Sequence, residues 1–213
     1  MKTKSRVFAG IVFVFILHSS FFCLAERPVP IQLPNPQTET GKPLMAALSS
    51  RMSTRSFSGE KLGKQDLSNL LWAAFGINRE NGKAPSATNW REIDIYVITA
   101  DGAYLYNLRK NTLNTIQTND IRAMAGTQSF VKDAAVNLIY VADYSRVDEE
   151  TLDVPILVGA DTGFISENVY LFCASEGFAT IVLASINRDL LAKELKLSPE
   201  QRIILAQSVG YPK

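Results

Sequence analysis

Two arginines and a serine lie close together in the stretch Arg51–Phe57, which reads RMSTRSF. Arginine guanidinium groups bind phosphate oxygens in pairs, and a serine hydroxyl can donate to a further oxygen. The spacing of Arg51, Ser53 and Arg55 therefore fits half of an anion-binding cradle. A solvated basic helix end gives the same pattern, and these three residues alone do not separate the two interpretations.

Hydrophobic periodicity predicts the elements on either side of this stretch. An apolar-periodic helix over residues 43–50 ends where the stretch begins, and an amphipathic helix over residues 67–75 follows, with Gly76 at its stop. Two segments rich in β-branched and aromatic residues then flank a hairpin turn: residues 93–99 and 103–108, around Asp101–Gly102. The basic stretch is therefore expected to be an extended connection between two helices.

The second half of the chain is dominated by a long helix predicted over residues 154–176 and closed by Gly177. Its apolar positions wrap most of the way round, which predicts a central helix with the sheet on one side and helices or a partner subunit on the other. The remaining predicted elements are short helices at 120–126, 128–134 and 188–196, buried strands at 135–143, 178–186 and 203–209, and a capped turn at Ser198.

The first 25 residues differ in composition from the rest of the chain. Lys2, Lys4 and Arg6 precede a nearly unbroken apolar run, and Ala25 is the small residue expected before a signal-peptidase cleavage site. This pattern predicts a secretory signal peptide and places the protein in the periplasm or outside the cell.

We expect three segments: the signal peptide at 1–25, a proline-rich linker or strap over a partner at 26–41, and one domain at 42–213. An uncleaved membrane anchor is one alternative for the first segment, because its apolar run is almost long enough to span a bilayer. A lipoprotein signal ending at Cys23 is another. In each case the positive flank stays in the cytoplasm and the body of the protein is exported.

Cleavage of this signal removes His18, the only histidine, and leaves Cys173 as the only cysteine. The mature chain would then lack histidine-based acid–base catalysis, a histidine-dependent triad and a conventional zinc site. Three of the 22 basic residues also leave, so 19 basic and 21 acidic side chains give a net charge of about −2. We therefore expect neither a metal nor a nucleic-acid partner.

Further motifs accompany the arginine–serine stretch. They are LLWAAFGINR at 70–79, KAPSATN at 83–89, SEGFA at 175–179 and VGYP at 209–212. In this order and at these separations they resemble the nitroreductase family of flavoproteins, particularly its small exported members, from about Leu44 onward. The resemblance implies an α+β fold with a mixed, mainly antiparallel sheet flanked by helices, in an interlocked homodimer that binds FMN at its interface.

The resemblance also implies roles for the residues of the stretch. Arg51 and Ser53 would hold the phosphate and ribityl chain of FMN, and Arg55 would approach the pyrimidine edge of the ring and stabilise negative charge there. Met52 stands where many relatives carry a second basic residue or histidine, so the phosphate has one donor fewer. Longer relatives continue to basic residues that close on the phosphate, a place that Lys213 is expected to take.

A loop of the partner subunit is implied to pass under the flavin ring, and its members match Pro85, Ser86, Ala87 and Asn89. Glu176 and Gly177 match a Glu-Gly pair whose backbone N–H groups point toward the flavin's reactive nitrogen. With Arg55, they are the expected catalytic positions. Gly177 as a plain helix stop and Asn89 as a turn residue are the structural alternatives.

The implied activity is FMN-dependent oxidoreduction, in which hydride passes through the flavin to a small acceptor such as a nitro compound, quinone or enone. This chemistry needs no histidine, because the protein only positions the flavin and stabilises charge on it. NAD(P)H is a poor assumption as donor for an exported protein, and residues 111–127 are expected to select the acceptor. A secreted flavin-binding module without turnover and a structural domain without cofactor stay open as alternatives.

Overall fold

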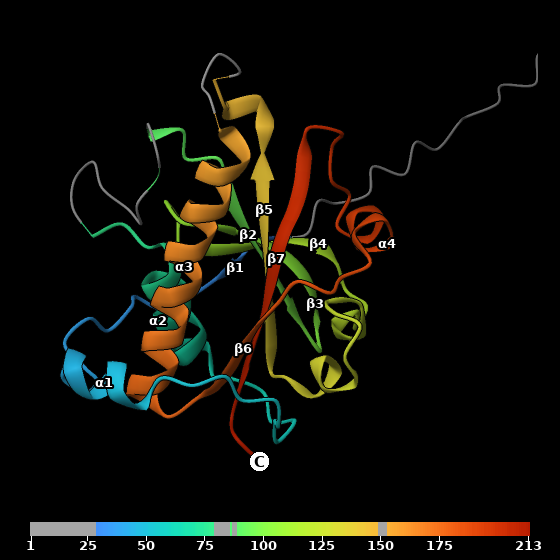
Figure 1. Ribbon diagram of the computed structural model, residues 1–213. Coiled ribbons are helices and arrows are strands. Elements are labelled where there is room, and N and C mark those ends of the chain that lie inside the picture. The colour runs from blue at the N-terminus through green and yellow to red at the C-terminus, as the bar shows by residue number, and fades with distance from the viewer. Residues whose placement is uncertain (1–28, 79–85, 87–88, 149–152) are drawn as a thin grey trace, which may run out of the picture.

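The computed structural model describes residues 29–78, 86, 89–148 and 153–213, which form one sheet with helices on both faces (Figure 1). The strands are β1 Ile31–Gln32, β2 Ile93–Thr99, β3 Gly102–Asn107, β4 Thr112–Gln117, β5 Val136–Asp143, β6 Ala179–Leu183 and β7 Gln201–Gly210. The α-helices are α1 Leu44–Ser50, α2 Lys64–Phe75, α3 Val154–Glu176 and α4 Arg188–Glu194, with 3-10 helices at Arg122–Met124, Ser129–Asp133 and Tyr144–Arg146.

The sheet order is β1-β4-β3-β2-β5-β7-β6, and the six neighbouring pairs in the described part of the chain are all antiparallel. The expected α+β fold with an antiparallel sheet flanked by helices is confirmed. The parallel pairing of a mixed sheet does not occur among these strands. The predicted hairpin is present, since Tyr96 pairs with Leu105 and Thr99 with Gly102.

Each central strand sends alternate side chains to opposite faces of the sheet, and packed elements cover both faces. Leu138 and Tyr140 of β5 pack with α2 and α3, whereas Ile139 and Val141 pack with α4 and the loops around the 3-10 helices. Both clusters of β5 side chains are fully buried. The sequence of β5 is therefore apolar at nearly every position and does not alternate between apolar and polar residues.

The helix α3 has the bounds that the sequence predicts. Pro155 lies in its first turn, where a missing N–H costs nothing, and Gly177 ends it in the left-handed conformation with φ 82°. The helix lies across the sheet and packs against α1 and α2. Among the described residues, no helix is long and apolar enough to cross a membrane.

The segment expected as a linker or as a strap over a partner is extended but lies on its own chain. Ile31 pairs with Leu113 at the edge of the sheet, and Leu33 is buried in the core. The carbonyl of Pro34 accepts hydrogen bonds from Ser68 Oγ at 2.6 Å and Asn111 Nδ2 at 2.7 Å. Side-chain donors thus fix the part of this segment that follows β1, where Pro34 and Pro36 lack the backbone N–H that a ladder needs.

The segment 111–127, expected to select the acceptor, contains β4 and is therefore partly a regular strand. Thr112–Gln117 pairs with both β3 and β1. Its sequence, TLNTIQ, places Leu113 and Ile116 on opposite faces of the sheet and has no period-2 alternation that would predict a strand. The part of this segment outside a strand is the loop around Arg122–Met124.

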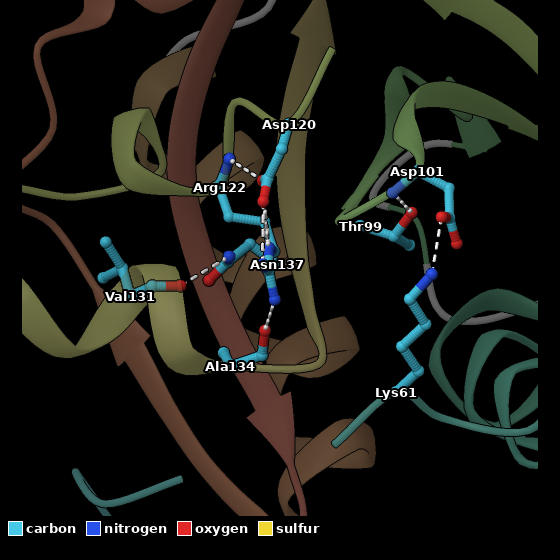
Figure 2. A network of polar contacts seen from close by, with 8 residues as sticks. All are labelled: Lys61, Thr99, Asp101, Asp120, Arg122, Val131, Ala134 and Asn137. Carbon is cyan, nitrogen blue, oxygen red and sulfur yellow. Dashed lines mark hydrogen bonds and ion pairs between the residues drawn. The ribbon is translucent and has the colours of Figure 1, made fainter. Parts of the chain in front are cut away.

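Side chains hold this loop and its neighbour to the sheet (Figure 2). Arg122 forms an ion pair with Asp120 at 2.7 Å and donates from Nη1 to the Ala134 carbonyl at 2.9 Å. Asn137 of β5 donates from Nδ2 to the Val131 carbonyl at 2.9 Å. These bonds satisfy loop carbonyls that the sheet leaves without a ladder partner.

Candidate functional site

The arginine–serine stretch runs extended beside the start of β6 and the segment Tyr211–Lys213. Thr54 N donates to Thr180 O at 2.8 Å, Phe57 forms an antiparallel bridge with Pro212, and Ser58 N donates to Tyr211 O at 3.0 Å. The backbone of the stretch is therefore fixed at its middle to β6 and at its end to the segment that follows β7.

Arg51 and Ser53 meet at Tyr170 of α3. The Arg51 guanidinium lies over the Tyr170 ring, 5.1 Å from its centroid, and Ser53 Oγ lies 2.8 Å from the Tyr170 hydroxyl. The ring of Tyr170 is buried, and its hydroxyl also accepts from Val182 N at 3.0 Å. Sequence reasoning missed Tyr170, although a tyrosine inside an apolar helix signals a buried hydroxyl that needs a partner.

Further basic side chains lie at the same end of the sheet. Because Phe57 pairs with Pro212 in antiparallel register, Ser56 and Lys213 lie on adjacent backbones. Arg55 and Lys213 are exposed, and within the described residues neither forms an ion pair. Met52 is also exposed. The stretch and the segment beside it thus present several cations and a hydroxyl to one surface.

The loop expected under the flavin ring is described only at Ser86 and Asn89; Pro85 and Ala87 lie outside the described residues. The Ser86 hydroxyl accepts from Arg91 N at 2.9 Å and donates to Glu92 Oε2 at 3.2 Å. Asn89 has φ 62°, and its Oδ1 accepts from Arg91 Nε at 2.9 Å. Both side chains therefore hold the turn itself.

Two carboxyl groups are buried behind this turn. Glu92, which directly precedes β2, is 0% exposed, and Asp161 of α3 is 2% exposed. Burial raises the pKa of Glu92, and the neighbouring charge of Asp161 raises it further, because two buried like charges disfavour full ionisation. Ser86 donates to the same Glu92 carboxyl group. The turn therefore rests on the buried Glu92 carboxyl group, which favours keeping its proton.

The stretch and the turn lie at opposite ends of β5. Thr180, which binds the stretch, pairs with Val209, and Val209 pairs with Val136 at the start of β5. At the other end, Asp143 N donates to Glu92 O at 2.9 Å. Seven strand steps of about 3.3 Å separate these ends by about 23 Å. One chain therefore does not bring Arg55 and Ser86 together.

Glu176 and Gly177 lie at the end of α3, next to residues 37–42 of the extended N-terminal segment, here called the N-terminal strap. The N–H groups of Gly177 and Phe178 both donate to Cys173 O at 2.9 Å, so the glycine fills its structural role as a helix stop. Ser175 Oγ donates to Glu176 Oε1 at 3.0 Å and accepts from Lys42 N at 2.7 Å. Glu176 lines a cleft of about 370 Å³ between the strap and the helices. Their contact with a flavin stays a prediction.

The fold is that of an α+β protein, and the arginine–serine stretch lies beside its last strands as a candidate anion site. The sequence model described as the nitroreductase family matches residues 48–211, and the chain belongs to this family.

Individual relatives agree with this assignment. The crystal structure of a candidate nitroreductase from Ralstonia eutropha JMP134 is 37% identical, with a TM-score of 0.81 over 86% of this chain and 90% of that one. A candidate nitroreductase of Methanocaldococcus jannaschii, MJ1384, is 28% identical over 160 residues, which cover 69% of this chain and 81% of the relative. An NADPH:FMN oxidoreductase from Vibrio harveyi, complexed with NAD+, has the same fold at 17% identity, with a TM-score of 0.61 over 80% of this chain and 69% of that one.

Proposed function

We propose that this protein is an FMN-dependent oxidoreductase of the nitroreductase type, which passes hydride through a bound flavin to a small electron acceptor. The observation that carries the proposal is the arrangement at Tyr170, where Arg51 and Ser53 converge beside the exposed Arg55 and Lys213. Family membership and the fold shared with an FMN oxidoreductase support a flavin as the ligand.

The residues at this end fit the phosphate of FMN. Arg51 and Ser53 offer a charged donor and a neutral donor, the combination that binds phosphate oxygens well. Lys213 would add a charge from the adjacent backbone, and Arg55 would stabilise negative charge on the ring. Bound FMN would supply the hydride chemistry itself. The chain's own contribution would be to bind, orient and electrostatically stabilise the flavin.

The position of the two halves supports a homodimer. Arg55 and Ser86 are both expected at the flavin ring, yet about 23 Å of β5 separates their ends of the molecule. A second copy would bring its Ser86 turn to the Arg55 end of the first. We therefore place each flavin site between two subunits, with the stretch from one subunit and the turn from the other.

An exposed apolar face on α3 and α1 supports this assembly. Ile156 and Phe164 of α3 are 68% and 52% exposed, and between them Gly159 and Gly163 leave open space where a Cβ would stand. α1, which packs against α3, adds Leu44, Met45 and Leu48. Exposed large apolar side chains on neighbouring helices are typical of a protein contact, and small residues allow close helix approach. This α3–α1 face is the surface that we assign to the partner.

A flavin spectrum tests the proposed function. The protein purified from its native compartment is expected to be yellow, to bleach with dithionite and to recover its colour when a quinone or nitroaromatic acceptor is added. A yellow protein that no acceptor reoxidises would indicate a binding module without turnover. A colourless protein that FMN does not reconstitute would overturn the proposal.

We also propose that the protein is exported, with residues 1–25 as its signal, although these residues lie outside the described ones. Because an exported protein meets little NAD(P)H, its donor would be another reduced carrier of that compartment. Mass spectrometry of the protein from intact cells is expected to find Glu26 as the first residue. An N-terminus at Met1 together with membrane attachment would support an uncleaved anchor instead.

A further inference from the structure

The hydroxyl of Tyr170 takes part in two hydrogen bonds whose directions can be assigned. Val182 N is a backbone donor, so the Tyr170 oxygen must accept at that contact, which is 3.0 Å long. The remaining contact is to Ser53 Oγ at 2.8 Å, where geometry alone allows either oxygen to donate. The phenol has one proton and is buried, and a buried donor requires an acceptor.

Within the described residues, Ser53 Oγ is the acceptor within reach of that proton. Tyr170 therefore donates to Ser53, and the Ser53 proton is left to point elsewhere. A chain of donors results, from the Val182 N–H through the Tyr170 hydroxyl to the Ser53 hydroxyl. Hydrogen bonds in series polarise one another, so the last hydroxyl becomes a better donor.

We propose that Tyr170 is a positioning residue that sets the Ser53 hydroxyl as an outward hydrogen-bond donor to the phosphate group of a flavin nucleotide. This inference rests on the proposed function. The same tyrosine holds the second phosphate ligand, since the Arg51 guanidinium lies 5.1 Å from its ring centroid. Cation–π contact of this kind restricts a flexible arginine and leaves its N–H groups free for an anion. One buried side chain thus orients both donors of the cradle.

A comparison of FMN with riboflavin isolates this role, because riboflavin lacks the phosphate. In Tyr170→Phe the ring under Arg51 stays, while Ser53 loses its donor. We expect FMN affinity to fall about three- to tenfold, the scale of one hydrogen bond, and riboflavin affinity to stay within twofold. Fluorescence titration of the dimeric protein with each flavin measures both constants.

Two further variants separate positioning from general stability. Ser53→Ala combined with Tyr170→Phe should weaken FMN no more than Ser53→Ala alone, because the two hydroxyls act in series. Tyr104→Phe is the matched control, since Tyr104 is equally buried and its hydroxyl donates to Asp101 O at 3.0 Å, far from the cradle. It should lower the melting temperature without changing the ratio of the FMN and riboflavin affinities.

The outcomes distinguish this inference from the proposed function. If the wild-type protein binds FMN more tightly than riboflavin but Tyr170→Phe leaves that preference unchanged, Tyr170 has only a structural role and the inference is overturned. Equal and additive losses from the two hydroxyls would overturn it too. If the wild-type protein binds neither flavin, the proposed function fails and the inference fails with it.

Discussion

The two ends of β5 carry the two predicted halves of the flavin site, and they are built differently. At the start of β5, Arg51 and Ser53 rest on Tyr170 with donor groups left over for a ligand. At its end, the hydroxyl of Ser86 and the amide oxygen of Asn89 already hold their own turn. The first end has donors of the kind that an anion needs, whereas the polar groups of the second end already hold its shape.

This difference separates two contributions to ligand binding. Donors that have no internal partner can give affinity, whereas donors already paired can give only a surface against which a ring packs. Replacing Arg51 should therefore change how tightly a flavin binds. Replacing the groups under the turn should change stability first.

The largest effect is expected from breaking the α3–α1 face, because the two ends can meet only between subunits. Phe164→Glu places a charge in the assigned interface, and an unpaired buried charge costs several kcal/mol. The dimer dissociation constant should rise by about 100-fold or more, with loss of bound FMN. Leu190→Glu is the control, because Leu190 is 51% exposed on α4, across the sheet. Light scattering that finds a flavin-loaded monomer in the wild type would contradict the assembly.

The next effect concerns the phosphate end itself. Arg51→Ala should leave the fold intact and weaken FMN binding by one to two powers of ten, since a charge-assisted hydrogen bond contributes about 1.5 to 3 kcal/mol. Arg202→Ala is a matched control, because the Arg202 guanidinium also lies over a tyrosine ring, 4.7 Å from the centroid of the Tyr144 ring. This substitution should not change FMN affinity. A circular-dichroism melt and a flavin titration measure both quantities. Unchanged FMN affinity in Arg51→Ala would contradict the assignment of Arg51 to the phosphate of FMN.

A third prediction addresses the ring rather than the phosphate. Arg55→Met should lower the reduction potential of the bound flavin, because one charge-assisted contact to the reduced ring is lost. The free energy of flavin reduction should become less favourable by about 1 to 3 kcal/mol. Arg109→Met removes another exposed arginine and should leave the potential unchanged. Spectroelectrochemistry on the two variants decides this.

In the wild type, the rate of flavin reduction should vary little between pH 6 and 9, since Arg55 stays charged and the mature chain has no histidine to titrate. Stopped-flow bleaching with an artificial donor tests this. A bell-shaped profile would reveal an essential protein acid or base, with Glu176 and the tyrosines the first to replace.

The smallest effect is expected at the turn end, where the buried Glu92 carboxyl group sets the pH dependence of stability. The pKa of Glu92 is raised by burial and by Asp161, so the folded protein binds this proton more tightly than the unfolded chain. The stabilisation from this group is complete below about pH 4.5, its ordinary pKa, and is lost as the pH rises through the folded-state pKa.

Glu92→Gln keeps the shape without the titrating group, so its unfolding free energy should fall less than that of the wild type between pH 5 and 8. Urea melts across this range measure the difference, with the exposed Glu39→Gln as control. Parallel pH profiles for wild type and Glu92→Gln would show that Glu92 does not carry a proton in the folded state.

Much of the fold could be predicted because its signals are local. Helical periodicity and a closing glycine gave the bounds of α3, and the Asp101–Gly102 turn gave the hairpin of β2 and β3. The edge of the sheet could not be predicted in this way. β1 is two residues long, and its pairing with β4 depends on contacts some 80 residues apart in the chain.

Residue types and their spacing are enough to assign the family and most helices and strands, and to propose a chemistry for Arg51, Ser53 and Arg55, because these signals are local in the chain. The position of Tyr170 under Arg51 and Ser53 is visible in the tertiary structure alone, because 117 residues separate Ser53 from Tyr170 in the chain. The tertiary structure alone also shows that the stretch and the Ser86 turn lie at opposite ends of β5. Distances across a sheet follow from strand order and register, which long-range packing selects and which no local pattern contains.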